Sequence, residues 1–133
     1  MAGILPNEGE TLVANLLFKN ADVDRGTDLD IGLFTNTTTP ETITAATLTE
    51  PTGGSYARKT LTDASWTVTN DIASYAAQVF TATGSAYTGS IYGYFVVTKG
   101  TTPRIIAIEL DPAGPYTMAE NDTYTITPSI TIA

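Results

Sequence analysis

Short segments that alternate polar and apolar side chains run through most of the chain, separated by turn-forming residues. The clearest are residues 28–33 and 123–133. Alternation with period two is typical of strands with one buried face, and Gly, Pro, Asn and Asp between such segments indicate turns. Threonine makes up about a fifth of the chain, and β-branched residues favour strands. We therefore expect one all-β domain over residues 1–133, an antiparallel β-sandwich of jelly-roll-like form.

One segment, residues 91–97, is apolar without alternation, which predicts a central strand buried on both faces. The turn at Lys99 and Gly100 should return the chain into residues 104–110 as an antiparallel hairpin. In the last segment Pro128 should lie at an edge or a bulge, because proline cannot donate a ladder hydrogen bond. The segments expected to form strands are 28–33, 56–61, 66–69, 74–83, 91–97, 104–110, 116–118 and 123–133.

The one helix expected in this otherwise all-β chain spans about residues 8–19. Residues 1–20 are therefore expected to form an N-terminal arm followed by this helix. Asn7 followed by Glu10 has the spacing of a capping box. An apolar stripe follows at helical spacing. Residues 41–50 fit either a bulged strand or a short helical turn after a proline. The stripe consists of Leu12, Val13, Leu16 and Leu17.

Composition argues against several classes of function. Fourteen acidic residues against six basic ones give a net charge of −8, which repels phosphate, so neither nucleic acid nor an anionic membrane is an expected partner. The chain contains no Cys and no His, so we expect no disulfide, no metal site and no cofactor, and the commonest general base is missing. No stretch approaches the roughly 18 apolar residues of a membrane span. The first residues lack the features of a secretory signal, which indicates synthesis in a cytoplasm.

Two acidic groups could carry chemistry. Asp22, Asp24, Asp28 and Asp30 could form a calcium loop, but Thr27 and Leu33 occupy two positions where such a loop needs Gly and Glu, so a solvated turn is favoured. Glu109 and Asp111 share a strand face, as a glycosidase pair would. Residues two apart near a strand end are more often simply exposed. We expect no catalytic residues.

Aromatic and basic residues offer two further candidates. Four aromatic residues could stack a sugar, although aromatics on strands more often pack in a core. They are Trp66, Tyr56, Tyr92 and Tyr94. Arg58-Lys59 and the stretch from Lys99 to Arg104 are basic spots on an acidic chain. They could contact an acidic partner, with ordinary surface charge as the favoured alternative.

The order of several segments resembles a family of small virion proteins of tailed phages. The segments are DIGLFTN, LTEPTGGSYARKTL, Trp66, IYGYFVVTKGTT and NDTYTITPSITIA, which together span nearly the whole chain. The resemblance implies a structural, non-enzymatic protein of the capsid cement (decoration) type, found on the capsid surface of the virion and bound to the major capsid protein. The alternative is a carbohydrate-binding or adhesion module attached to the tail or head.

Self-association is also expected, as a trimer rather than a dimer. The apolar N-terminal residues, the helix stripe and the apolar end of the last strand offer more apolar surface than a small sandwich easily covers. An unpaired strand edge is also a liability in a monomer. The residues we expect to contact partners are Ile4, Leu5, Leu16, Arg58, Lys59, Lys99 and Arg104.

Overall fold

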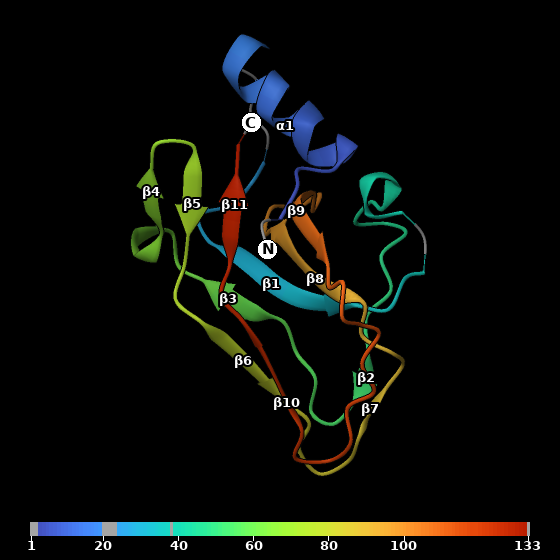
Figure 1. Ribbon diagram of the computed structural model, residues 1–133. Coiled ribbons are helices and arrows are strands. Elements are labelled where there is room, and N and C mark those ends of the chain that lie inside the picture. The colour runs from blue at the N-terminus through green and yellow to red at the C-terminus, as the bar shows by residue number, and fades with distance from the viewer. Residues whose placement is uncertain (1–2, 20–23, 38, 133) are drawn as a thin grey trace.

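The computed structural model describes residues 3–19, 24–37 and 39–132, which form several antiparallel sheets and a single α-helix at the N-terminal end (Figure 1). The helix is α1 (Asn7–Lys19), close to the predicted span. Two short 3₁₀ helices are η1 (Pro40–Thr42) and η2 (Asp63–Ser65). The strands are β1 (Leu29–Phe34), β2 (Thr52–Gly53), β3 (Lys59–Leu61), β4 (Thr67–Thr69), β5 (Ile72–Ser74), β6 (Gln78–Thr81), β7 (Tyr87–Thr88), β8 (Gly93–Thr98), β9 (Ile105–Leu110), β10 (Thr123–Ile126) and β11 (Ser129–Thr131).

The largest sheet has the strand order β3-β1-β8-β9, with every pair antiparallel. The predicted hairpin is confirmed as β8–β9, in register from Gly93 opposite Leu110, with a shift between Val96 and Val97. Gly93 permits this pairing, because a Cβ there would overlap the carbonyl of Glu109. The sheet therefore depends on a glycine in its central strand.

Two smaller antiparallel sheets, the pair β6–β10 and the three strands β11-β5-β4, are together called the second ladder. The strand predicted at 74–83 is shorter than expected, because only β6 and the last residue of β5 fall in that range. The single strand predicted at 123–133 is broken into β10 and β11. Pro128 causes the break, since it has no N–H to donate, and its carbonyl instead accepts from the N–H of Tyr75 at 3.1 Å. Pro128 thus lies in a gap between two strands, whereas the sequence predicted an edge or a bulge within one strand.

The N-terminal segment pairs with one strand of the four-stranded sheet and one strand of the second ladder. The N–H of Gly3 donates to the carbonyl of Ser129, and Ile4 exchanges two backbone hydrogen bonds with Ile108, all at 3.0 Å. Residues 3 and 4 therefore lie between β11 and β9 (Figure 1). They cover part of the β11 edge that the sequence suggested would need a neighbouring subunit.

Two hydrophobic clusters pack against the opposite faces of the four-stranded sheet. The larger cluster joins β1 and β3 to the second ladder, with members such as Ile31, Phe80 and Ile130. The smaller one includes Phe34 and Phe95 and is covered by Ile43, which follows η1. Every residue of β8 is buried, which confirms the strand buried on both faces. Leu29, Ile31 and Leu33 of β1 are buried as predicted.

Helix α1 begins differently from the expected capping box. The carbonyl of Pro6 accepts from the N–H of Glu10 at 3.0 Å, so helical bonding starts one residue earlier and Asn7 lies within the first turn. Gly9 lets the helix approach β9 closely, because a Cβ there would lie 3.0 Å from the backbone of Ile105 and Ile106. The helix is thus held near its first turn.

Other local predictions have mixed outcomes. Residues 41–50 contain the helical turn, η1, after Pro40 rather than a strand. Residues 116–118 form only an isolated bridge, between Tyr116 and Ile91. Leu110 is 48% exposed at the end of β9, whereas Ile108 of the same strand is buried. In the described part of the chain, no helix has the length and hydropathy to cross a membrane.

Candidate functional site

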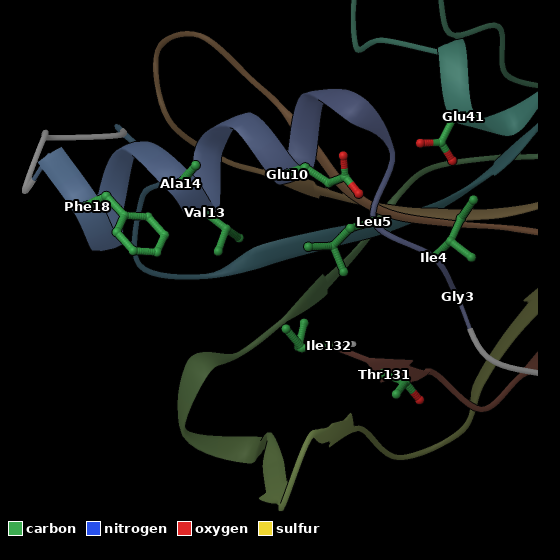
Figure 2. A pocket seen from close by; sticks show the side chains of 10 residues that line it. All are labelled: Gly3, Ile4, Leu5, Glu10, Val13, Ala14, Phe18, Glu41, Thr131 and Ile132. Atoms are coloured by element: carbon green, nitrogen blue, oxygen red, sulfur yellow. The ribbon is translucent and has the colours of Figure 1, made fainter.

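A groove lined largely by apolar side chains opens between α1, the N-terminal segment and β11 (Figure 2). Its volume is about 670 Å³. In Figure 2, Leu5, Val13 and Phe18 extend toward the side of the groove formed by Ile132. We call it the α1 groove. Its lining residues are Gly3, Ile4, Leu5, Glu10, Val13, Ala14, Phe18, Glu41, Thr131 and Ile132.

A second hollow of about 380 Å³ adjoins the α1 groove on the side of β4 and β5. Leu5, Val13 and Ile132 line both hollows. Leu16 and Val68 line only the second one, from α1 and β4 respectively. The helix is therefore flanked by apolar surface on two sides instead of being packed flat on a sheet.

Exposed apolar side chains concentrate around these hollows. Of the predicted helix stripe only Leu12 is buried, whereas Leu17 is 69% exposed. Phe18 is 86% exposed. Large exposed apolar patches on soluble domains mark interaction sites more often than chance. The exposed large apolar residues that line one or both hollows are Ile4, Leu16, Phe18, Val68 and Ile132.

The structure brings three of the predicted contact residues together and places the other four elsewhere. Ile4 and Leu5 line the α1 groove, and Leu5 and Leu16 line the adjoining hollow. The sequence did not single out Phe18, whereas Ile132 belongs to the apolar end of the last strand that was expected to support association. Phe18 lies off the predicted stripe, so only its apolar character at the end of a helix could have drawn attention to it.

The four basic residues predicted as contacts all have intramolecular partners. Arg58 forms a bidentate pair with Glu50, with 2.7 Å between Nη2 and Oε2. The Nζ of Lys99 lies 3.2 Å from Asp30. Lys59 lies over the ring of Phe80 at 5.5 Å, and the Nε of Arg104 is 3.9 Å from Glu8.

Tyr56 extends the Arg58–Glu50 pair into the four-stranded sheet. Its hydroxyl donates to Oε1 of Glu50 at 2.7 Å and accepts from the N–H of Leu33 at 2.9 Å. Burial raises the pKa of Tyr56 well above its usual value, and the hydrogen bond with the Glu50 carboxylate raises it further. Tyr56 and Arg58 thus stabilise the fold through Glu50.

Glu8 fixes the start of α1. Its Oε2 accepts from the N–H of Ile105 at 2.8 Å and from the N–H of Ala45 at 3.0 Å. One carboxylate therefore joins the helix to β9 and to the segment after η1. Arg104, predicted as a partner contact, is the basic residue nearest this carboxylate.

The proposed sugar-stacking residues do not share an exposed face. Tyr94 is buried, Tyr56 packs with Phe80 and Tyr87, and Trp66 packs against Tyr75. Every aromatic residue of the chain lies in the described part, and Phe18 is the one that is mostly exposed. The arrangement follows the core alternative for these aromatics.

The acidic candidates separate into two cases. Asp22 lies outside the described residues, while Asp24 accepts from the N–H of Thr102 and Asp28 from the N–H of Asp63. Asp30 contacts Lys99 as described above, and no group of three or more acidic residues that could hold a metal occurs in the described ranges. Glu109 and Asp111, in contrast, line one small pocket.

Together these features define a mostly β protein with an apolar groove beside its helix. Comparison with protein-family models, with curated proteins and with solved structures found no match.

Proposed function

We propose that this chain is a structural protein that attaches to another protein through the α1 groove. The observation that carries the proposal is the concentration of exposed apolar side chains around α1, from Phe18 on the helix to Ile132 beyond β11. Such surface suits a protein partner, since apolar burial contributes roughly 25 cal/mol per Å².

The segment order supports a specific form of this role, that of a phage capsid cement or decoration protein. In this form the partner is the major capsid protein, the location is the outer surface of the capsid in the virion, and no enzymatic activity is involved. A shell offers many identical sites, and multiple attachment points raise avidity without new kinds of contact. The net charge of −8 disfavours contact with packaged nucleic acid.

Self-association is part of the same proposal, with a trimer preferred to a dimer. The two hollows beside α1 give each copy more than one apolar surface, so that one could contact a second copy and the other the shell. A specific interface buries more than about 1,000 Å².

The finer description of the fold is also a proposal. We infer that the four-stranded sheet and the second ladder are the two layers of a β-sandwich. The larger hydrophobic cluster supports this, because it contains Ile31 and Leu61 of the first layer and Phe80 and Ile126 of the second. The jelly-roll-like form stays a prediction.

Binding of the purified protein to undecorated, expanded capsids tests the proposed function. We expect saturable binding that weakens modestly as salt increases, because apolar contacts depend little on ionic strength while exposed charge pairs are screened. Phe18→Gln should weaken binding by about tenfold or more, as expected for the loss of one large apolar contact.

Val79→Thr is the matched control, because Val79 is also an exposed apolar residue, 45% exposed on β6 and outside the lining of both hollows. Equal losses for the two variants would remove the α1 groove from the proposal. If expanded capsids take up no protein and it is found at the tail of intact particles, the adhesion alternative replaces the cement role.

A further inference from the structure

A small pocket of about 190 Å³ lies between the end of β9 and β10, and shares no lining residue with the α1 groove. It combines two carboxylates with two tyrosine side chains. Two threonines and Ile126 complete its wall. The lining residues are Tyr94, Glu109, Asp111, Tyr124, Thr125, Ile126 and Thr127.

Glu109 is the unusual member of this set. It is only 7% exposed, and its Oε1 is buried without a hydrogen-bond partner among the described residues. The hydroxyl of Tyr94, a residue that is 4% exposed, is likewise buried and forms no well-aligned hydrogen bond, although the Glu109 carboxylate and the Ser129 backbone lie close enough to affect its pKa. Burial raises the pKa of Tyr94, and the nearby Glu109 carboxylate raises it further. Buried polar groups are normally satisfied, so two such groups on one pocket wall indicate a missing partner.

Asp111 differs because both of its oxygens are occupied. Oδ1 accepts from the N–H of Ala113 at 3.0 Å, and Oδ2 accepts from the hydroxyl of Tyr124 at 2.7 Å. It therefore adds negative charge to the pocket while its position stays fixed. The ion pairs between described residues involve neither Asp111 nor Glu109.

We propose that this pocket binds a primary ammonium group. An ammonium carries one positive charge and three donors. These suit the Glu109 carboxylate and the Tyr94 hydroxyl as acceptors, and the negative charge of Asp111 adds electrostatic attraction. A divalent metal fits less well, because Ca²⁺ takes six to eight oxygens and only Glu109 has a free carboxylate here. The ring of Tyr124 and the side chain of Ile126 provide apolar wall for the methylene stem of the ligand.

Two sources present this group, a free aliphatic diamine and a lysine side chain of a partner protein. The inference does not depend on the proposed function. It is tested by NMR titration of the ¹⁵N-labelled protein with 1,5-diaminopentane in one arm and with Nα-acetyl-lysine amide in the other. In at least one arm we expect saturable shifts of the amide signals of residues 109–111 and 124–127. Nα,Nε-diacetyl-lysine amide, which has the same shape and no charge, should cause none.

Two variants and a control assign the shifts to the pocket. Glu109→Gln keeps the volume and removes the charge, and should weaken binding by about tenfold or more. Thr125→Leu should block the pocket from an exposed strand position, which gives a second test if Glu109→Gln alters folding. Glu120→Gln, an exposed carboxylate outside the lining, should leave binding unchanged.

Binding of the diamine alone would identify a free amine as the ligand, and binding of the lysine amide would identify a partner lysine. The proposal is overturned if neither compound shifts these signals at high millimolar concentration. It is equally overturned if the neutral analogue binds as well, if neither variant weakens binding, or if Ca²⁺ saturates the same signals more tightly than either amine.

Discussion

The hydroxyl of Tyr56 links β1 to a residue outside the sheet. It accepts a hydrogen bond from the N–H of Leu33 in β1 and donates one to the Glu50 carboxylate. Tyr56→Phe would leave the Leu33 N–H without this acceptor in a partly buried position, which should reduce the free energy of unfolding by about 1–3 kcal/mol. Urea denaturation measures the loss.

Tyr116→Phe is the control for this substitution. Tyr116 packs edge-on against Tyr124, and its hydroxyl makes no hydrogen bond with the described residues. The control should change stability by less than about 0.5 kcal/mol. An equal effect of the two substitutions would show that ring packing, and not the Tyr56 hydroxyl, is responsible.

Buried tyrosines also predict how stability depends on pH. The pKa values of Tyr56, Tyr94 and Tyr124 are raised above the usual value near 10 by burial and by neighbouring carboxylates. Above about pH 10 the unfolded chain therefore releases protons that the folded chain retains, so stability falls as pH rises. Each such group can contribute up to about 1.4 kcal/mol per pH unit. The lowered pKa of Tyr75, due to its hydrogen bond with Thr62, acts in the opposite direction.

Chemical denaturation between pH 8 and 11.5 checks this prediction. The tyrosines should leave the free energy of unfolding nearly unchanged up to about pH 10 and should lower it above that pH. The slope of the decline should be smaller in Tyr56→Phe than in the parent protein. An unchanged slope would show that Tyr56 ionises as freely in the folded state as in the unfolded one.

At the scale of elements, α1 depends on Glu8 for its attachment. Two backbone N–H groups, of Ala45 and Ile105, donate to the same carboxylate oxygen. Glu8→Ala should lower the free energy of unfolding by about 1–3 kcal/mol, because both partly buried donors lose their acceptor. Glu10→Ala removes a carboxylate from the same helical turn, at an exposed position, and should have a much smaller effect. Thermal unfolding followed by circular dichroism compares the two, and equal effects would contradict the role given to Glu8.

The N-terminal segment is the second element whose role follows from the structure. Ile4→Pro would remove the N–H that donates to the carbonyl of Ile108, whereas Ile4→Ala would keep it. Ile4→Pro should therefore be less stable than Ile4→Ala by about 1 kcal/mol or more. Amide hydrogen exchange should also be faster at the N–H of Ile108 in the proline variant. Equal stability of the two variants would show that the segment does not contribute through its backbone pairing.

For the whole molecule, the exposed apolar surface predicts association between copies. We expect sedimentation velocity to detect a species larger than the 14.0 kDa monomer, preferably a trimer, at high micromolar concentration. Phe18→Gln should shift the equilibrium toward monomer if α1 contributes to the contact between copies, and Val79→Thr should not. A parent protein that remains monomeric throughout would contradict self-association.

The local features of this chain follow from its amino-acid sequence without reference to the fold. The β-rich composition, the helix near residues 8–19 and the β8–β9 hairpin all follow from short-range rules of periodicity and backbone chemistry. The burial of β8 on both faces also followed, because an apolar run without alternation has no face suited to water.

The surfaces that remain exposed, and the charged groups that have partners, depend on how the elements pack in three dimensions. Periodicity placed Leu16 and Leu17 on a packing stripe, but Gly9 and Glu8 hold α1 against β9 at its first turn and leave the rest of the stripe beside open hollows. The partners of Arg58 and Glu8 likewise depend on residues brought together by folding. Contacts across strands are set by register and layer packing, which short-range rules do not encode.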